Sequence, residues 1–261
     1  MKTVILCGGK GTRLREETEF RPKPMVPIGE RPILWHIMKI YAAHGHNDFV
    51  LCLGYKGDTI KDYFRNYLWM ASDITLNLGP NPNVQIHGGH AEEDWSVTLA
   101  ETGQEAQTAC RIKRIERYIG SDDCFLLTYG DGVGNVDVNA AIAEHRRSGN
   151  ICTVTGVHPP GRFGELGLGK DRRLVTSFNE KPQAEGGFIN GGFMVCSREI
   201  FRYLSDDPMD IFEKGALRVL AGEGKLGTYL HEGFWQPMDT FMEFTLLNRL
   251  WAESNAPWKI W

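Results

Sequence analysis

The sequence predicts an α/β fold: a doubly wound, mostly parallel mixed sheet with small antiparallel additions. Short apolar runs rich in β-branched residues, which are typical of strands buried on both faces, recur along the chain. They alternate with longer segments whose apolar residues have helical spacing. A β–loop–α–β–α order of this kind favours a parallel sheet with helices on both faces.

The N-terminal part sets this pattern. Thr3–Cys7 is predicted as a buried strand, and Gly8–Leu14 breaks it as a glycine-rich loop. Further along, the apolar spacing predicts helices at Ile33–Ala43 and Lys56–Ala71 with a buried strand at Asp48–Tyr55 between them. Short alternating segments joined by Gly, Pro and Asn turns are expected as antiparallel additions at one edge: Asp73–Leu78, Val84–His87 and Ser96–Glu101.

The rest of the sequence continues the alternation of predicted strands and helices, and its pattern changes from Gly161 onward. Helices are predicted at Ala106–Ile119, Val138–Arg147, Arg198–Leu204, Asp210–Ala221 and Thr240–Glu253. Strands are predicted at Cys124–Tyr129, Ile151–Val157, Phe193–Cys196 and Gly227–His231. The residues from Gly164 to Lys181 alternate around Gly169-Lys170-Asp171, which indicates a hairpin. Asp239 or Thr240 is expected to cap the last helix.

Bulk properties narrow the class of protein. The 261 residues suffice for a single domain, 1–261, and 42% apolar with 24% charged residues is ordinary globular composition. The net charge of -4 and the lack of a long Lys/Arg run argue against nucleic-acid binding. No segment approaches the ~20 apolar residues of a membrane helix. Six cysteines without a C-x-x-C pair predict reduced thiols and a cytoplasmic location.

The loop Gly8-Gly9-Lys10-Gly11-Thr12-Arg13-Leu14 directly follows a buried strand and suits a phosphate. Glycines let the backbone approach a ligand closely, successive N–H groups form an anion cradle, and Arg13 offers a fork of donors. The residue order is wrong for a Walker A loop, and Leu14 stands where a dinucleotide loop needs its third glycine. A glycine turn without a ligand stays open as an alternative.

Arg21-Pro22-Lys23-Pro24-Met25 adds a lysine on a stiff mount, because two prolines restrict the backbone around Lys23. A lysine held close to a phosphate cradle is suited to charge that develops on phosphorus. We therefore expect Lys23 to be catalytic, together with Arg13. An ordinary proline-rich loop is the alternative for this piece alone.

Two aspartates are candidate Mg²⁺ ligands. Asp131, between Gly130 and Gly132, follows a predicted central strand, where open α/β sheets bind ligands. Mg²⁺ takes one or two carboxylates plus phosphate oxygens, so Asp131 and Asp239 together would suit it. A turn aspartate and a helix N-cap are the respective alternatives.

Glu180-Lys181-Pro182 and Asn190-Gly191-Gly192 are candidate contacts for a sugar phosphate. Glu180 would accept bonds from sugar hydroxyls, and Lys181 would contact the phosphate. Asn190 and Gly191 would bring an amide and backbone to the same ligand. The alternative for Glu180 and Lys181 is an exposed charge pair in a turn, and Arg162 is a weaker candidate anion contact.

In this order, these pieces resemble the sugar-1-phosphate nucleotidyltransferase family. The family's G-G-x-G-T-R-L, P-K-P, strand-end G-D, E-K-P and late metal aspartate match Gly8–Leu14, Pro22–Pro24, Gly130-Asp131, Glu180–Pro182 and Asp239. The resemblance implies a Rossmann-like nucleotidyltransferase fold, Mg²⁺ as cofactor, and sugar-binding and C-terminal elements from about 160 to 261. It also implies a set of nucleotide contacts: Leu6, Gly8, Gly9, Lys10, Gly11, Thr12, Arg13, Lys23, Arg111 and Gly130.

Within the family, the chain is similar to the glucose-1-phosphate cytidylyltransferase branch. Glu16 replaces a proline common in thymidylyl and uridylyl members, and P-I-L-W-H-I-M-K, F-L-L-T-Y-G-D-G-V and F-W-Q-P-M-D-T match the branch. The resemblance implies CTP and glucose 1-phosphate as partners, CDP-glucose for deoxysugars of surface polysaccharide, and a homo-oligomer. For Arg111, a solvated basic helix face is the alternative to a nucleotide contact.

Three other functions remain open at this point. One keeps the chemistry with UTP, dTTP or a mannose phosphate, and one is an inactive subunit that senses nucleotide sugars. Retention of Arg13, Lys23, Asp131 and Asp239 argues against the inactive subunit. The third is a nicotinamide oxidoreductase, which the missing third glycine disfavours.

Overall fold

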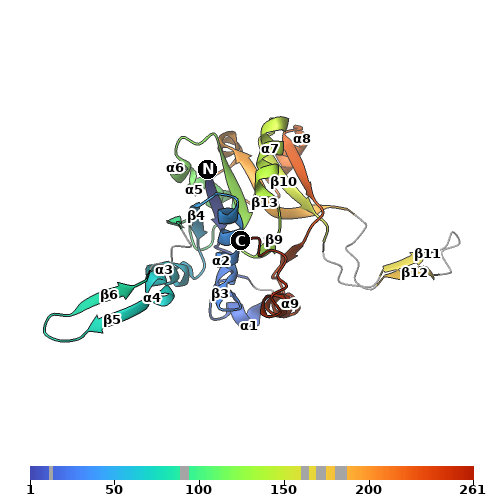
Figure 1. Ribbon diagram of the computed structural model, residues 1–261. Coiled ribbons are helices and arrows are strands. Elements are labelled where there is room, and N and C mark those ends of the chain that lie inside the picture. Colours follow the sequence, from blue (N-terminus) through green and yellow to red (C-terminus); the bar gives the residue numbers. More distant parts are fainter. Residues whose placement is uncertain (12–13, 89–93, 160–164, 169–174, 180–186) are drawn as a thin grey trace.

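A computed structural model describes residues 1–11, 14–88, 94–159, 165–168, 175–179 and 187–261 (Figure 1). Its main sheet comprises β1 (Lys2–Leu6), β4 (Asp48–Leu53), β7 (Ser96–Glu101), β8 (Cys124–Tyr129), β10 (Cys152–Val157), β13 (Ile189–Ser197) and β14 (Leu226–His231). The order of these seven strands is β14-β10-β13-β8-β1-β4-β7. Strand β13 is antiparallel to β8 and β10, and the other neighbours are parallel. The predicted fold class is confirmed.

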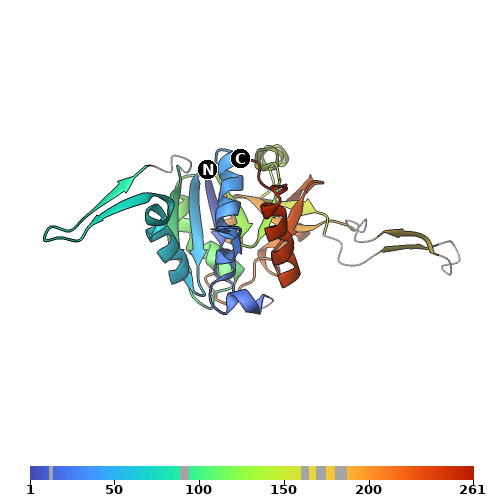
Figure 2. The same cartoon turned by 60° about the horizontal axis from the view of Figure 1, so that its bottom comes forward.

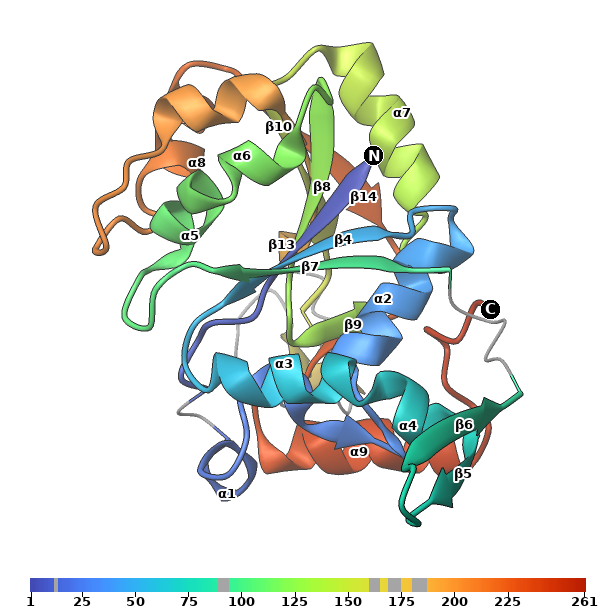
Figure 3. The same ribbon diagram turned by 90° about the vertical axis from the view of Figure 1, so that its left-hand side faces the viewer.

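Helices cover both faces of the sheet. The α-helices are α1 (Arg15–Thr18), α2 (Ile33–Ala43), α3 (Gly57–Arg65), α4 (Tyr67–Ala71), α5 (Thr108–Arg114), α6 (Glu116–Ile119), α7 (Val138–Ser148), α8 (Ala216–Gly222) and α9 (Phe241–Ala252). Two 3₁₀ helices are η1 (Lys23–Met25) and η2 (Arg198–Tyr203). Figure 3 shows α5, α6 and α8 on one face, and α2 and α7 on the other. In the described ranges, no helix combines the length and apolarity needed to cross a membrane.

Strand β1 shows why the sheet needs two helical layers. Val4 and Leu6 belong to one buried cluster together with Ile112 of α5. Ile5, between them, belongs to the other cluster together with Ile37 of α2. Successive side chains of a strand point to opposite faces, so a continuous apolar run requires cover on both.

Two hairpins project from opposite ends of the body (Figures 1 and 2). Strand β5 (Asp73–Asn77) pairs antiparallel with β6 (Asn83–His87), and β11 (Glu165–Leu168) pairs antiparallel with β12 (Val175–Asn179). These pairings confirm the hairpin predicted between 164 and 181, whose expected turn at Gly169-Lys170-Asp171 lies outside the described residues. They also confirm antiparallel pairing for Asp73–Leu78 and Val84–His87, but this pair forms a separate two-stranded sheet and is not an addition to an edge of the main sheet. A further small sheet joins β2 (Pro27–Ile28) to β3 (Arg31–Pro32).

The prediction for Ser96–Glu101 is wrong, because this segment is the parallel edge strand β7 beside β4. Its polar and apolar residues alternate because an edge strand is only partly covered. Along β7, Ala100 is buried while Ser96 and Glu101 are exposed. An alternating sequence pattern indicates this partial burial. It does not indicate whether the neighbouring strand runs parallel or antiparallel.

Several predicted helices are shorter or divided. The helix expected at Lys56–Ala71 is split at Asn66, and the one expected at Ala106–Ile119 begins at Thr108 and is split at Ile115. Asn66 has φ -96° and ψ 8°, a conformation outside the regular helix. The helix expected at Asp210–Ala221 begins only at Ala216, and Arg198–Leu204 forms the 3₁₀ helix η2. Apolar spacing marks the buried face but not such breaks.

Candidate active site

A cavity of about 270 Å³ opens at the carboxyl ends of β1 and β8, the edge where open α/β sheets bind ligands. Eight residues proposed from the sequence line it: Leu6, Gly8, Gly9, Gly11, Lys23, Arg111, Gly130 and Asp131. The other lining residues are Cys7, Pro24, Ala106, Gln107, Thr108 and Tyr129. The glycine loop, the proline-flanked lysine and the strand-end aspartate therefore face one space.

Glycine is required where the loop approaches its neighbours. Gly11 has φ +62°, and a Cβ there would lie 2.8 Å from Thr18 Cγ2 and 3.1 Å from Lys23 Cβ. The Thr18 hydroxyl donates to Gly11 O at 3.0 Å, which fixes the end of the loop. A Cβ on Gly130 would lie 2.8 Å from Leu6 O and 2.9 Å from Pro24 Cγ. These two glycines let β1, β8 and the lysine segment pack closely.

Arg111 is buried beneath the glycine loop, with only 4% of the residue exposed. Its guanidinium donates to Gly8 O at 3.0 Å, Leu53 O at 2.9 Å and Gly103 O at 2.7 Å. It also donates to Thr102 Oγ1 at 2.9 Å and to Gln104 O at 3.3 Å. The alternative of a solvated basic helix face is therefore wrong for Arg111, and its contact with a nucleotide stays a prediction. Arg111 ties together the ends of β1, β4 and β7 while it lines the cavity.

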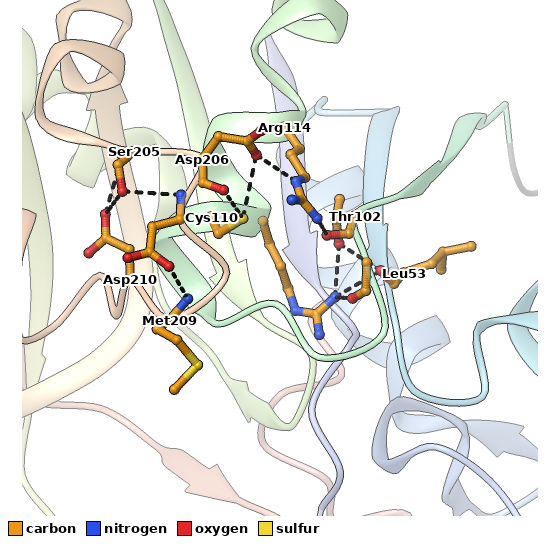
Figure 4. Close-up of polar contacts among 11 residues, drawn as sticks. Leu53, Thr102, Cys110, Arg114, Ser205, Asp206, Met209 and Asp210 are labelled. Carbon is orange, nitrogen blue, oxygen red and sulfur yellow. Dashed lines mark hydrogen bonds and ion pairs between the residues drawn. The ribbon is translucent and has the colours of Figure 1, made fainter.

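Helix α5, which carries Arg111, is anchored on its other side by the 205–210 loop (Figure 4). Arg114 donates to Asp206 Oδ1 at 2.6 Å and to Thr102 O at 2.8 Å, and Cys110 Sγ lies 3.6 Å from the same Asp206 oxygen. Gln107 N donates to Pro208 O at 2.8 Å. These contacts hold the start of α5 at the cavity wall.

Lys23 lies between two aspartates, of which Asp131 lines the cavity and Asp239 lies behind Lys23, outside the lining. Its Nζ donates to Asp131 Oδ2 at 2.6 Å and also to Asp239 Oδ1. The Lys23 side chain is only 9% exposed, compared with 32% for Asp131 and 13% for Asp239. Because Lys23 begins η1 between Pro22 and Pro24, its backbone has little freedom to carry the ammonium elsewhere.

Two short strands bring the aspartates together. Strand β9 (Gly132–Gly134) follows Asp131, and β15 (Trp235–Pro237) precedes Asp239. They pair antiparallel, with Gly132 opposite Pro237, and Met238 N donates to Asp131 O at 2.8 Å. This ladder converts two separate sequence motifs into one acidic pair.

Burial and the two aspartates act on the pKa of Lys23 in opposite directions. Burial by itself would lower the pKa of Lys23, because it penalises the ammonium. The charges of Asp131 and Asp239 and their hydrogen bonds outweigh burial, so the pKa of Lys23 is raised above its ordinary value. Lys23 is therefore a fixed positive charge at neutral pH.

Thr240, and not Asp239, caps helix α9. The Thr240 hydroxyl accepts from Glu243 N at 3.3 Å, and the Glu243 carboxylate accepts from Thr240 N at 2.8 Å, which is a capping box. The same carboxylate accepts from Asp239 N at 2.7 Å. The helix start thus fixes the backbone of Asp239 while its carboxylate contacts Lys23.

The donor chemistry at Lys23 fits a divalent cation. Asp131 and Asp239 direct carboxylate oxygens at one ammonium, so a positive charge already lies between them. Mg²⁺ is commonly bound by one or two carboxylates and completes its shell with phosphate oxygens and water. Among the residues described, no group of three or more His, Cys, Asp or Glu side chains gathers around one point.

The candidate sugar-phosphate residues on β13 lie next to Tyr129. Asn190 Nδ2 donates to Tyr129 Oη at 3.4 Å, and Gly191 O accepts from Trp235 Nε1 at 2.8 Å. Gly192 has φ +87°, and a Cβ there would lie 2.7 Å from Tyr129 Cδ2. The side chains of Tyr129 and Trp235 thus connect this segment to the cavity and to β15.

Of the remaining predicted site residues, one is paired away from the cavity and the others lie outside the residues that the structure describes. Lys10 pairs with Glu105 at 2.8 Å, and both side chains are more than half exposed. Thr12 and Arg13 of the glycine loop lie outside the described residues, as do Arg162, Glu180 and Lys181. Their proposed contacts with the nucleotide, the sugar and its phosphate stay predictions.

Sequence reasoning missed several cavity residues. The sequence marks Ala106, Gln107 and Thr108 only as the start of a predicted helix, and no local pattern indicates that they form a wall of the site. Tyr129 did carry a signal, because it stands in the strand-end motif before Gly130-Asp131.

Comparisons with known proteins show which family the chain resembles over most of its length. The family model described as "Nucleotidyl transferase" matches residues 2–240. The chain is 47% identical over 261 residues to the glucose-1-phosphate cytidylyltransferases of Salmonella typhimurium and Salmonella typhi, with 100% of each chain covered. The solved structure of HddC from Yersinia pseudotuberculosis has a TM-score of 0.66 at 22% identity, covering 96% of this chain and 99% of that one. At this identity, HddC shows a shared fold alone.

Proposed function

The chain belongs to the nucleotidyl transferase family, and we propose that it transfers the cytidylyl group of CTP to glucose 1-phosphate, giving CDP-glucose and pyrophosphate. The observation that carries the chemistry is the ammonium of Lys23 between Asp131 and Asp239, at a cavity lined by the glycine loop. The choice of CTP and glucose 1-phosphate is supported by full-length similarity to enzymes with that activity.

In the proposed reaction, a phosphate oxygen of the sugar attacks the α-phosphorus of CTP, and pyrophosphate leaves in line. The attacking oxygen is already anionic at neutral pH, so positioning and charge stabilisation account for catalysis. The glycine-loop amides and Arg13 would hold the leaving pyrophosphate. Lys23 would stabilise charge at the α-phosphorus.

Asp131 and Asp239 would hold a Mg²⁺ ion, which supplies positive charge to the phosphate oxygens when bound. For this, Lys23 Nζ must give up at least part of its contact with the two carboxylates. A triphosphate in the cavity offers anionic oxygens to replace them, so Lys23 can exchange carboxylate partners for phosphate. Lys23 and Gly11 line the same cavity, which supports this exchange.

We propose that the sugar phosphate binds on the Asn190 side of the cavity, with Glu180, Lys181, Asn190 and Gly191 as contacts. This places the sugar-binding elements in the part of a single 1–261 domain that begins at about 160. The contact between Asn190 and Tyr129, a cavity residue, supports this side.

We also propose a cytoplasmic location and a homo-oligomeric state. All six cysteines are free, which suits a reducing compartment. The β5–β6 hairpin exposes several large apolar side chains, among them Leu76 and Val84, which supports contact with another copy of the chain.

The test is a panel of CTP, UTP, dTTP and GTP with glucose 1-phosphate and mannose 1-phosphate, measured by pyrophosphate release with and without Mg²⁺. We expect CTP with glucose 1-phosphate to give the highest kcat/KM, and Mg²⁺ removal to abolish turnover. A higher kcat/KM with UTP or dTTP would replace the proposed base. Absence of pyrophosphate with every pair would refute nucleotidyl transfer.

A further inference from the structure

A carboxylate outside the proposed catalytic set joins two sides of the cavity. Glu213 Oε2 accepts from the Thr108 hydroxyl at 2.8 Å, and Glu213 Oε1 accepts from the Tyr129 hydroxyl. Thr108 and Tyr129 both line the cavity. Tyr129 in turn contacts Asn190, a candidate sugar contact, at 3.4 Å.

The donor and acceptor of each hydrogen bond from Glu213 through Tyr129 to Asn190 are fixed by the chemistry of the groups. A carboxylate only accepts, so the Tyr129 hydroxyl must donate its proton to Glu213. The Tyr129 oxygen then presents its lone pairs, and Asn190 Nδ2 donates to one of them. Asn190 Oδ1 accepts from Gly192 N at 2.9 Å, so both ends of the amide are oriented.

This arrangement directs one polar group outward. Tyr129 uses one N–H of the Asn190 amide, and the second has no partner among the described residues. Asn190 is exposed, so this second N–H is available to an acceptor oxygen on a ligand. If the amide turned over, its oxygen would face the ligand in place of this donor.

The ring of Tyr129 has little freedom to respond in another way. Gly192 packs against it so closely that a Cβ would lie 2.7 Å from the ring. With the ring held in place, the phenol proton stays directed at the Glu213 carboxylate, which can only accept it. Glu213 therefore determines the donor and acceptor directions of the hydrogen bonds that run through Tyr129 to Asn190.

We propose that Glu213 is a positioning residue, which acts through Tyr129 to orient the Asn190 amide toward the sugar phosphate and so determines recognition of that substrate. This rests on the proposed function, because it takes the Asn190 side as the sugar side. Thr108 holds the other oxygen of Glu213, and Phe212 N donates to the Thr108 hydroxyl at 2.9 Å, which anchors the carboxylate.

The test compares steady-state kinetics of Tyr129→Phe, Glu213→Ala, the double variant and Glu213→Gln with those of the wild type. Loss of one such hydrogen bond should raise KM for glucose 1-phosphate about tenfold. KM for CTP should stay within about twofold, because the glycine loop and Lys23 are unchanged. The double variant should be no worse than Tyr129→Phe, since Glu213 acts only through that hydroxyl. Glu213→Gln keeps an acceptor and should recover most of the wild-type KM.

Tyr203→Phe is the matched control, because Tyr203 also donates to a glutamate, Glu223, at 2.9 Å, but at a distant surface. It should leave both KM values unchanged. Additive effects in the double variant, equal rises in both KM values, or unchanged KM for the sugar phosphate would each overturn the assignment. The wild type tests the function separately. If it prefers another sugar phosphate, the same comparison is made with that substrate.

Discussion

At the scale of single residues, Lys23 is the charge on which the candidate site depends. Lys23→Ala and Asp131→Asn should each lower kcat by about 10²–10³, because each removes a positioned charge from the proposed transition state. Lys225→Ala is the matched control, since its ion pair with Glu223 lies on the surface. A Lys23→Ala protein that folds and keeps wild-type turnover would contradict the proposed role.

The same variant makes a prediction that does not depend on turnover. Without the Lys23 ammonium, Asp131 and Asp239 lose the cation between them, so they should attract a divalent ion more strongly. Binding of Mn²⁺ to the nucleotide-free protein, followed by electron paramagnetic resonance, should tighten at least about tenfold in Lys23→Ala. Unchanged affinity would mean that the carboxylates do not form the metal site.

His36 makes a pH-dependent contribution to stability. It is fully buried, its Nε2 donates to Ile28 O at 3.0 Å, and its Nδ1 accepts from Trp258 Nε1 at 3.3 Å. These bonds require the neutral ring. Burial lowers the pKa of His36 from 6.5 to about 4, although the hydrogen bond to Ile28 opposes this. The unfolded chain therefore binds the proton more readily than the folded one.

This contribution is complete above pH 6.5 and is lost as the pH falls toward 4. Between pH 7.5 and pH 5, it should reduce the free energy of unfolding by about 2 kcal/mol. Urea unfolding at both pH values should show a smaller decrease for His36→Gln than for the wild type. His87→Gln, at an exposed position, should retain the wild-type decrease. Equal decreases in all three proteins would exclude His36 as a source.

At the scale of elements, the start of α9 couples helix stability to the site. Thr240→Ala removes the hydroxyl of the capping box and should cost about 1 kcal/mol of stability. Because Asp239 precedes the cap, its carboxylate should also be less well placed, and the Mg²⁺ concentration for half-maximal activity should rise. Thr240→Ser keeps the cap, so it should match the wild type in thermal unfolding and in Mg²⁺ dependence. A Thr240→Ala protein with wild-type values would contradict this coupling.

The strands and helices also show which elements a sequence pattern can predict. Apolar runs located β1, β4 and β8 because a strand buried on both faces needs apolar side chains at every position. The pattern failed at β7, where partial exposure at the sheet edge imitates an antiparallel strand. It also missed the break at Asn66, because the non-helical φ and ψ of one residue leave the residue types on either side of it unchanged.

At the scale of the whole molecule, the β5–β6 hairpin exposes apolar side chains that contact with another copy of the protein would bury. Leu76 is paired with Val84, and Ile74 with Ile86, so these side chains share one face of the two-stranded ribbon. Two strands alone are marginally stable in water, and Leu76 is 50% exposed. This face is therefore expected to pack against another copy.

Leu76→Asp should weaken that contact and shift the molar mass measured by light scattering toward the monomer. Gln85→Asp lies at the next position of the ladder, opposite Thr75, so its side chain is on the other face and should leave the mass unchanged. A wild-type protein that is monomeric would refute the oligomer, and an unchanged mass in Leu76→Asp would remove the hairpin from its interface.

The sequence by itself determined where most of the main strands lie along the chain and which residues stand at their carboxyl ends, because burial and chain reversal are local demands on residue type. It also marked Lys23 as a catalytic candidate and paired Asp131 with Asp239 as candidate ligands of one Mg²⁺ ion. Only the tertiary structure decided that Lys23 bridges both aspartates, that Arg111 is turned inward, and that Glu213 reaches Tyr129. Such contacts join elements far apart in the chain, so they follow from strand order and packing, which leave no periodic signal in any one segment.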